Sequence, residues 1–271
     1  MNKARYTLGI DIGSTASKCI IMKDRTEIIA KAIISVGAGT TGPFRALDEA
    51  LKQAGLTKGA IEYTVATGYG RNTFADADEQ MSELSCHAKG AAFMFPGVRT
   101  IIDIGGQDAK VLSVSPAGKL INFLMNDKCA AGTGRFMEVM ARVLDGDISS
   151  FAEMSEKSAQ RIDISSTCTV FAETEVISYL AKAVPVEDII AGIHRSVASR
   201  VGNLAKRANV QSPVVITGGV AKNAGIVKAL GAEINAIIHC NEYCQLNGAI
   251  GAALYAYDIL LEEENEDGKE D

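Results

Sequence analysis

The stretch Leu8-Gly9-Ile10-Asp11-Ile12-Gly13 is the clearest indication of the fold, because it occurs a second time as Thr100-Ile101-Ile102-Asp103-Ile104-Gly105. The two copies are 92 positions apart, and so are the lysines that follow them, Lys18 and Lys110. Each copy is an apolar run that ends in Asp-Ile-Gly and is followed by a short turn and a second apolar run. This order predicts two buried strands joined by a tight turn, formed twice in one chain.

A second repeated motif extends the duplication. Val65-Ala66-Thr67-Gly68 returns as Val215-Ile216-Thr217-Gly218, now 150 positions away. The second half therefore contains about 58 extra residues between its two repeated motifs, within residues 110–215. The pattern predicts an α/β protein built from a duplicated β-β-β-α-β-α unit. We expect a first half at 1–97, a second half with a helical insertion at 98–261, and an acidic disordered tail at 262–271.

The spacing of apolar residues and the positions of glycine and proline predict the secondary-structure elements. Strands are expected at 6–11, 18–22, 27–36, 63–66, 100–104 and 213–216, and helices at 43–54 and from about 78 to 95. Within the insertion, apolar spacing predicts a helix from Phe136, another just after Cys168, and a long one from Pro185 to Arg207. Ser150 and Glu153 are spaced as a capping box for a further short helix.

Composition excludes several classes of protein. The chain has 271 residues, 47% of them hydrophobic, with no apolar run long enough to span a membrane. Asp11 interrupts the position where a signal peptide would need its apolar stretch, so we do not expect a secreted protein. The last ten residues hold seven acids and one lysine, which accounts for the whole net charge of −6. The remaining body is neutral, so nucleic acid is a poor candidate partner. We expect a cytoplasmic protein whose six cysteines are thiols or ligands and not disulfides.

The two repeated turns predict a nucleotide site. Small residues let backbone N–H groups approach phosphate closely, and carboxylates at strand ends can hold Mg²⁺ through its waters. Asp11 and Asp103 stand at these ends. A third glycine turn, Thr217–Ala221, follows an apolar strand and suits the nucleoside; we call it the adenosine turn. Alone, each Asp-Ile-Gly could equally be an ordinary hairpin turn, but two copies in register with a third turn favour nucleotide binding.

These residues resemble the acetate and sugar kinase/Hsp70/actin superfamily, with Ile10–Lys18 and Ile102–Lys110 as phosphate motifs and Val215–Ala221 as the adenosine motif. Within it, the chain looks like the ATP-dependent activators of (R)-2-hydroxyacyl-CoA dehydratases, of the 2-hydroxyglutaryl-CoA and 2-hydroxyisocaproyl-CoA type. The more specific matches are Asn126–Phe136 and Ser165–Glu173. The resemblance covers everything before the acidic tail, and it implies duplicated actin-like (RNase H-like) ATPase domains around a nucleotide cleft.

The resemblance also implies residue roles. Asp11, Asp103 and Gln107 would organise Mg²⁺ and the attacking water. The implied nucleotide-binding residues are Gly13, Ser14, Thr15, Ala16, Lys18, Gly105, Gly106, Gly132, Thr133, Gly134, Arg135, Gly218, Gly219, Val220, Asn223 and Gln245.

In that family, two cysteines from each subunit share one [4Fe–4S] cluster across a homodimer, which implies Cys129 and Cys168 as ligands here. Both lie in polar, small-residue segments, and both are expected just before helices, whose N-termini stabilise anionic groups. Two thiols in one chain cannot complete a four-thiolate site, so a cluster implies the dimer. The spacing of the cysteines alone would also allow zinc or no metal.

Other patterns are weaker. Gly37–Gly42 reads GxGxxG, a dinucleotide fingerprint, but it follows the third strand of a hairpin series and precedes a proline. No GxxxxGK[ST] motif occurs, so a P-loop is excluded. Cys240 and Cys244 form a lone CxxxC, more typical of core or surface thiols than of a metal site. Cys86 and His87 are expected to pack in a helix core.

The resemblance therefore implies an ATPase that passes a low-potential electron from ferredoxin or flavodoxin, through the cluster, to a 2-hydroxyacyl-CoA dehydratase. Two alternatives remain at this point. One is a small-molecule kinase of the same fold, of the N-acetylglucosamine type, which would need a catalytic aspartate in a sugar pocket and neither Cys129 nor Cys168. The other is an actin-like or chaperone-like nucleotide switch. Neither alternative predicts iron.

Overall fold

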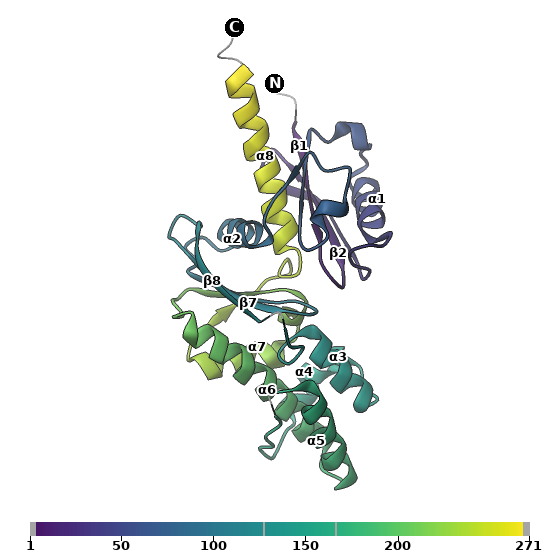
Figure 1. The fold of residues 1–271 in the computed structure, drawn as a ribbon, viewed down its shortest axis with the longest axis vertical. Helices are drawn as coiled ribbons and strands as arrows, with labels where there is room; N and C mark the ends of the chain where they lie inside the picture. The colour runs from purple at the N-terminus through teal and green to yellow at the C-terminus, as the bar shows by residue number, and fades with distance from the viewer. Residues whose placement is uncertain (1–3, 127, 166, 268–271) are drawn as a thin grey trace. The chain divides into compact units, whose positions relative to one another are not determined.

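The computed structural model describes residues 4–126, 128–165 and 167–267, and the chain forms two compact units (Figure 1). Unit 1 comprises residues 1–96 and 246–271, and unit 2 comprises residues 97–245. The last helix therefore belongs to unit 1, whereas the sequence prediction placed it in the second half. That prediction rested on chain order, and order does not reveal a segment that returns to an earlier unit.

Unit 1 contains a five-stranded sheet in the order β3-β2-β1-β4-β5. Its strands are β1 (Tyr6–Ile12), β2 (Ser17–Lys23), β3 (Glu27–Ile34), β4 (Tyr63–Thr67) and β5 (Glu79–Gln80). Its helices are α1 (Gly42–Ala54), α2 (Glu83–Met94) and α8 (Asn247–Asp267), with the 3-10 turns η1 (Lys58–Ala60) and η2 (Arg71–Thr73). The helix expected from about residue 78 begins at Glu83, because residues 79–80 pair with β4 as an edge strand.

Unit 2 repeats this sheet in the order β8-β7-β6-β9-β10. The strands are β6 (Thr100–Ile104), β7 (Ala109–Val114), β8 (Leu120–Asn126), β9 (Val214–Thr217) and β10 (Ile238–His239). The helices are α3 (Gly134–Val143), α4 (Phe151–Glu156), α5 (Thr169–Ala181), α6 (Val186–Arg207) and α7 (Ala224–Ile234), with η3 (Ile148–Ser150) and η4 (Gly219–Lys222). The insertion that carries the two cysteines thus lies between β8 and α6.

The strand registers confirm the duplication residue by residue. On the antiparallel side of each central strand, Asp11 pairs with Lys18 and Asp103 pairs with Lys110. On the parallel side, Asp11 lies opposite Thr67, and Asp103 opposite Thr217. The β1 and β6 strands are buried along nearly their whole length, as expected for strands at the centre of a sheet.

Helix packing completes each unit. In unit 1, α1 lies against β2 and β3, while α8 packs along β1 and β4 and against α2. The two helices pack closely at Gly251, because a Cβ there would collide with the backbone at Cys86 in α2. The Thr7 hydroxyl donates to the Ala253 carbonyl over 3.1 Å and holds α8 on the sheet. Cys86 and His87 are buried at this contact, as expected.

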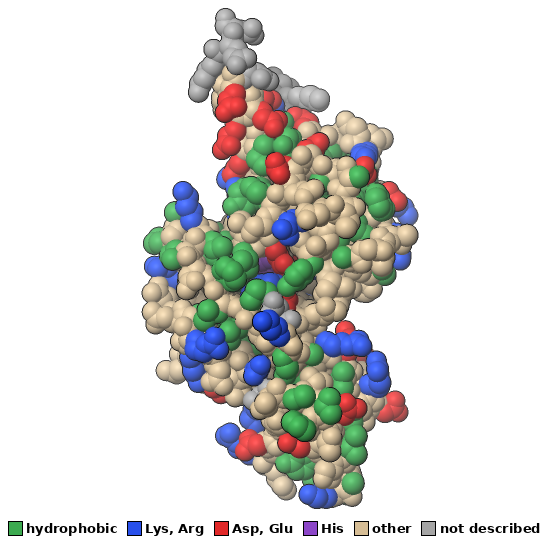
Figure 2. Space-filling model, in the orientation of Figure 1, with side chains coloured by type: hydrophobic (Ala, Val, Ile, Leu, Met, Phe, Trp, Pro, Cys, Tyr) green, Lys and Arg blue, Asp and Glu red, His purple; other side chains and the backbone are tan. Residues whose placement is uncertain are grey.

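The C-terminal end of α8 is acidic and exposed (Figure 2). Residues 262–267, which the sequence assigned to a disordered tail, continue this helix, and the rest of that tail lies outside the described residues. Glu263 accepts a hydrogen bond from the Tyr63 hydroxyl at 3.2 Å, and Glu264 pairs with Arg5. These contacts with β4 and the start of β1 favour the helical continuation. Among the described residues, no helix has both the length and the apolar character for crossing a membrane.

Candidate functional site

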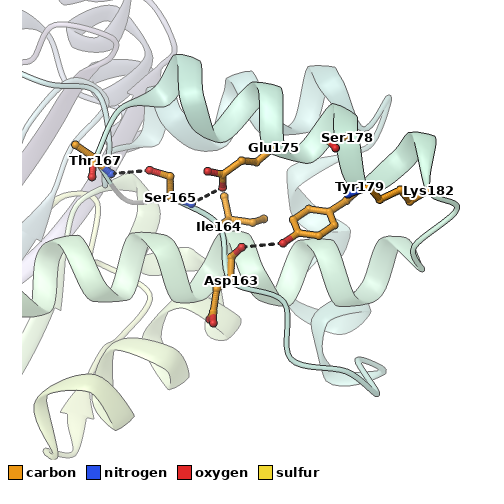
Figure 3. A pocket seen from close by; sticks show the side chains of 8 residues that line it. All are labelled: Asp163, Ile164, Ser165, Thr167, Glu175, Ser178, Tyr179 and Lys182. Atoms are coloured by element: carbon orange, nitrogen blue, oxygen red, sulfur yellow. Dashed lines mark hydrogen bonds between the residues drawn. The ribbon is translucent and has the colours of Figure 1, made fainter.

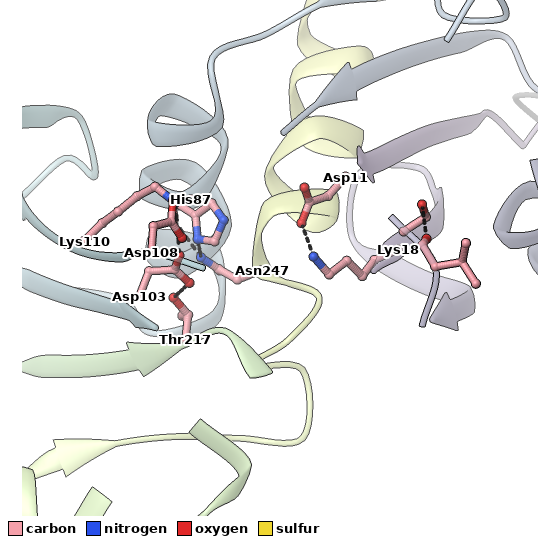
Figure 4. Close-up of polar contacts among 10 residues, drawn as sticks. Asp11, Lys18, His87, Asp103, Asp108, Lys110, Thr217 and Asn247 are labelled. Carbon is pink, nitrogen blue, oxygen red and sulfur yellow. Dashed lines mark hydrogen bonds and ion pairs between the residues drawn. The ribbon is translucent and has the colours of Figure 1, made fainter. Parts of the chain in front are cut away.

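The first repeated turn joins β1 to β2. The Gly13 N–H donates to the Ala16 carbonyl at 3.0 Å, which closes the turn and leaves Ser14 and Thr15 at its outer edge. Asp11, at the end of β1, is buried, and Lys18 Nζ lies 3.0 Å from its Oδ2 (Figure 4). The turn therefore brings the predicted phosphate-binding residues of unit 1 beside one carboxylate.

The second turn has the same construction. The Gly105 N–H donates to the Asp108 carbonyl at 2.9 Å, and Gly106 and the exposed Gln107 form its tip. Asp103 accepts a hydrogen bond from the Thr217 hydroxyl at 2.8 Å, and Lys110 Nζ lies 3.8 Å from its Oδ2. These side chains converge in a buried polar group (Figure 4).

Asp108 is a member of this group that the sequence analysis missed. Its Oδ2 lies 2.6 Å from Lys110 Nζ, closer than Asp103, and both side chains are buried. A buried ammonium requires such partners, because an unpaired charge costs several kcal/mol in the interior. The signal was present in the repeat: Asp108 occupies the position of Ala16 in the first copy, so the second turn has an extra carboxylate.

The first turn of α3 is bonded to the second repeated turn through its backbone. The Gly134 N–H donates to the Gly105 carbonyl at 2.9 Å, and the Arg135 N–H donates to the Gly106 carbonyl at 2.8 Å. Thr133 is buried, and its hydroxyl donates a hydrogen bond to the Ala130 carbonyl at 2.6 Å. The structure thus brings the predicted 132–135 segment onto the predicted phosphate turn of the same unit.

The adenosine turn follows β9. Gly218 has a φ of +88°, a conformation that favours glycine, and its N–H donates to the Cys244 carbonyl at 2.9 Å. A Cβ at Gly219 would lie 3.6 Å from Gln245 Nε2, so the predicted Gln245 lies beside this turn.

Two other predicted nucleotide residues have structural roles here. The Val220 side chain packs in the core of unit 2. Asn223 caps α7, because its Oδ1 accepts from the Ile226 N–H at 3.1 Å. Its buried Nδ2 has no hydrogen-bond partner within the described part of the chain. Arg135 is exposed and pairs with Glu138 of its own helix, at 3.0 Å.

The two predicted cysteine ligands lie in neighbouring loops. Cys129 and Cys168 are both half-buried free thiols, and Cys129 Sγ lies 3.7 Å from the carbonyl oxygen of Thr167. Cys168 is the residue before α5, as predicted, and its side chain makes no capping hydrogen bond. Cys129 lies in the loop before α3, as predicted, and α3 begins at Gly134, two residues earlier than the apolar spacing indicated.

Hydrogen bonds fix the segment that leads into Cys168. Ser165 N–H donates to Glu175 Oε2 at 2.7 Å, and the Tyr179 hydroxyl donates to the Asp163 carbonyl at 3.2 Å (Figure 3). From α6, the Ser196 hydroxyl donates to the Ser165 carbonyl at 2.9 Å. This segment and α5 border an open pocket of about 670 Å³. Cys168 therefore follows a segment of chain that these hydrogen bonds hold in place.

The predicted capping box at Ser150 is wrong. Ser150 makes no side-chain cap, and its hydroxyl donates instead to the Asp147 carbonyl at 2.8 Å. Asp147 caps the preceding η3 by accepting from the Ser149 N–H at 2.9 Å. The GxGxxG stretch also has a structural role, because the Ala38 N–H donates to the Gly13 carbonyl at 3.0 Å.

A duplicated five-stranded sheet, with an Asp-Ile-Gly turn in each copy and a glycine turn after β9, defines an actin-like ATPase, which confirms the predicted fold class. A family model matches residues 8–256, and the chain belongs to the BadF/BadG/BcrA/BcrD ATPase family. The ATPase class expected from the sequence is thereby confirmed.

Individual relatives agree with the sequence-based resemblance. The chain is 56% identical to the 2-hydroxyisocaproyl-CoA dehydratase activator of Clostridioides difficile, over 96% of this chain and 98% of the relative. It is 58% identical to the (R)-2-hydroxyglutaryl-CoA dehydratase activating ATPase of Acidaminococcus fermentans, over 93% and 97%. The resemblance to dehydratase activators is thus confirmed.

Solved structures give the same result. The structure of the C. difficile activator with bound ADPNP has a TM-score of 0.94 to this chain, covering 96% of it and 97% of the activator. A ROK family glucokinase from Streptomyces griseus has a TM-score of 0.59 at 13% identity, covering 93% of this chain and 99% of the kinase. That likeness extends to the fold alone, so it does not support the kinase alternative.

Proposed function

We propose that this chain is an ATP-dependent reductive activator of a 2-hydroxyacyl-CoA dehydratase. Two copies hold one [4Fe–4S] cluster through Cys129 and Cys168 of each, and a ferredoxin or flavodoxin supplies the electron. The support is the ATPase family together with relatives that are named as activators of such dehydratases. We expect it to act in the cytoplasm, and the acyl-CoA substrate to bind the dehydratase and not this chain.

One structural observation carries the coupling part of the proposal. The Gly134 and Arg135 N–H groups donate to the carbonyls of Gly105 and Gly106, at the tip of the second turn. The Cys129 loop leads directly into this segment, and Asn126 at the end of β8 holds the loop, because its Nδ2 donates to the Cys129 carbonyl at 3.2 Å and the Ala131 carbonyl at 3.4 Å. A shift of the second turn is therefore transmitted to a cysteine loop through a short stretch of hydrogen-bonded backbone.

The residues present fit half of a cluster site. Cys129 and Cys168 are half-buried thiols in neighbouring loops, and no acidic side chain stands in the first turn of α5. The N-terminus of α5, uncapped by a side chain, offers N–H groups and the positive end of its dipole to an anionic group. Two thiolates in each chain require a second copy for four. When bound, the cluster supplies one-electron transfer at low potential.

For hydrolysis, the two turns supply backbone N–H donors to phosphate, and Asp11 and Asp103 offer carboxylate oxygens to the waters of Mg²⁺. Lys18 and Lys110 already lie beside these carboxylates and would lower the cost of gathering negative charge there. Gln107, exposed at the tip of its turn, is the side chain we assign to the attacking water. Gln245 and the adenosine turn hold the nucleoside.

The test is anaerobic purification followed by iron, sulfide, ATPase and dehydratase-activation measurements on the same preparation. We expect four irons per dimer, and Cys129→Ser and Cys168→Ser should each abolish iron binding while ATP still binds. Cys240→Ser is the matched control, because it removes an exposed thiol from another loop of unit 2. Full iron content in either ligand variant, or an iron-free parental protein, would refute the cluster.

A further inference from the structure

His87 is a buried polar side chain of unit 1 that the proposed activity does not use. It belongs to α2, and the residue is only 6% exposed. Helix α8 packs so closely on α2 that a Cβ at Gly90 would collide with the Asn247 carbonyl oxygen. This contact holds Asn247, the first residue of α8, beside the imidazole ring (Figure 4).

The ring lies near Asp11 of the same unit. A Cβ placed on Gly248 would be 3.0 Å from His87 Nε2 and 3.2 Å from Asp11 Oδ2, so both polar atoms border the space at this glycine. Lys18 Nζ lies 3.0 Å from the same carboxylate oxygen. Three polar atoms around one small space are enough to hold an ordered water. Any other residue at position 248 would put its side chain into that space.

Asn247 determines which ring nitrogen of His87 has the proton. The Asn247 Nδ2 donates to the His87 carbonyl at 2.9 Å, which fixes the orientation of the amide, and the same nitrogen lies 3.4 Å from His87 Nδ1. Because an amide nitrogen only donates, Nδ1 is the acceptor, and the tautomer inferred from this arrangement has its proton on Nε2. The ring therefore offers an N–H to the space beside Asp11.

We infer that His87 is a positioning residue for ATP hydrolysis: its Nε2–H donates to a water molecule, and that water donates to Asp11 Oδ2. The effect on hydrolysis rests on the proposed function, which assigns Asp11 to the waters of Mg²⁺. The tautomer of His87 and the geometry at Gly248 do not depend on it.

The bridging water acts by fixing the carboxylate. Its oxygen accepts from His87, so its own protons turn toward acceptors, and Asp11 Oδ2 is the acceptor on the opposite side. Lys18 contacts the same carboxylate oxygen from the next strand. A carboxylate that is oriented in advance needs no reorganisation during the reaction, and this is the source of its contribution to the rate.

The two copies of the repeat orient their aspartates differently. In unit 2, Asp103 accepts directly from the Thr217 hydroxyl at 2.8 Å. Thr67 is the equivalent residue opposite Asp11, but its hydroxyl donates to a backbone carbonyl at 3.0 Å. The water held by His87 supplies in unit 1 the contact that a threonine supplies in unit 2.

The first experiment reads the tautomer without measuring activity. The chain has three histidines, so the anaerobic full-length protein with isotope-labelled histidine gives few ring signals, and His87→Gln identifies those of His87 by their loss. Long-range proton–nitrogen spectra distinguish protonated from unprotonated ring nitrogens. We expect a protonated Nε2 and an unprotonated Nδ1, and a protonated Nδ1 overturns the assignment.

The second experiment separates the donor from the packing of the ring. His87→Gln keeps an N–H near the place of Nε2, whereas His87→Asn keeps one only near Nδ1. We expect the kcat of ATP hydrolysis to fall about tenfold in His87→Asn, as for the loss of one hydrogen bond, and to stay within about threefold of parental in His87→Gln. The KM for MgATP should stay near parental in both, because the proposed contact is to Asp11 and not to the nucleotide. Equal losses of kcat in the two variants overturn the role.

Gly248→Ala tests the water without removing a polar group. The new methyl group occupies the space between the two polar atoms, so kcat should also fall about tenfold. The urea midpoint should stay near parental, because alanine favours a helix. Gly59→Ala is the matched control, since a Cβ there meets nothing within 4 Å, and its kcat should be parental.

The outcomes distinguish this inference from the proposed function. A parental kcat in His87→Asn or in Gly248→Ala overturns the positioning role. A parental protein without ATPase activity instead overturns the proposed function, while the spectra still decide the tautomer of His87.

Discussion

The hydrogen bond from Thr217 to Asp103 allows a sharp test of the second turn. Its length is 2.8 Å, and both side chains are buried. Thr217→Val removes the hydroxyl while nearly keeping the shape of the side chain, and leaves Asp103 Oδ1 without this donor. A hydrogen bond to a charged group contributes about 1.5–3 kcal/mol, so the variant should lower the free energy of unfolding of unit 2 by about 2 kcal/mol.

The duplication supplies a matched control. Thr67 holds the corresponding register position in β4, opposite Asp11, and is also fully buried. Its hydroxyl donates to the Met81 carbonyl at 3.0 Å and not to a carboxylate. Thr67→Val therefore removes a neutral hydrogen bond, for which we expect a loss of about 1 kcal/mol in unit 1.

The assay is urea unfolding of the nucleotide-free protein, followed by circular dichroism and fitted with a separate transition for each unit. A loss of about 2 kcal/mol changes the unfolding equilibrium about thirtyfold, which the fit resolves. ATPase rates should fall in Thr217→Val, because Asp103 loses the contact that orients it, and stay near parental in Thr67→Val. An equal or larger cost in Thr67→Val, or an unchanged ATPase rate in Thr217→Val, would refute the reasoning.

Four further outcomes are expected. Burial lowers the pKa of His194 to about 4, so between pH 6.5 and 4 the unfolded chain binds a proton that the folded chain does not. The free energy of unfolding should therefore fall by up to about 3 kcal/mol as the pH drops from 6.5 toward 4. The urea midpoint of His194→Leu should depend less on pH than that of the parental protein. Asp103→Asn should slow ATP hydrolysis while equilibrium dialysis still detects ATP binding. Gly251→Ala should lower the thermal midpoint, at a cost of about 1–3 kcal/mol, because the new methyl group meets the backbone at Cys86. An iron chelator should convert the proposed dimer to monomers on size exclusion, and a dimer that survives complete iron loss would contradict a cluster-held interface.

The repeat explains why so much of the fold could be predicted from the sequence. Strands buried on both faces produce continuous apolar runs, and a duplicated run with a duplicated turn leaves few alternatives for pairing. The same alignment placed Asp11 and Asp103 at equivalent strand ends, which the registers confirm. Glycine-rich turns were predicted for the same reason, since close backbone approach restricts which residues can stand there.

The errors arose where neighbours far apart in sequence decide the structure. The return of α8 to unit 1 depends on its contacts with β1 and α2, which no local pattern reveals. Ser150 does not form its expected cap because its hydroxyl donates to the Asp147 carbonyl, while the Asp147 side chain caps the preceding η3. Asp108 was overlooked because the comparison of the two copies searched for identities. The informative position was a difference, a carboxylate in the place of Ala16.

Comparing the copies by hydrogen bonds, and not by identities, reveals where the insertion is attached. In unit 1, the Gly13 carbonyl accepts from the Ala38 N–H, in the loop between β3 and α1. In unit 2, the equivalent Gly105 carbonyl accepts from the N–H of Gly134, the first residue of α3, which follows the loop after β8. In both units, the chain that follows the third strand of the sheet is thus bonded to the same atom of the repeated turn.

The loop that carries Cys129 is therefore the counterpart of an ordinary sheet-to-helix connection. Unit 1 keeps the short form, with its literal GxGxxG sequence, and unit 2 has the same connection extended by the insertion. A connection whose backbone is bonded to the turn moves when the turn moves. A cysteine in the longer connection of unit 2 is therefore coupled to the second turn. The coupling that we propose then requires no separate relay, and it should be lost first in variants that break the Gly134–Gly105 contact.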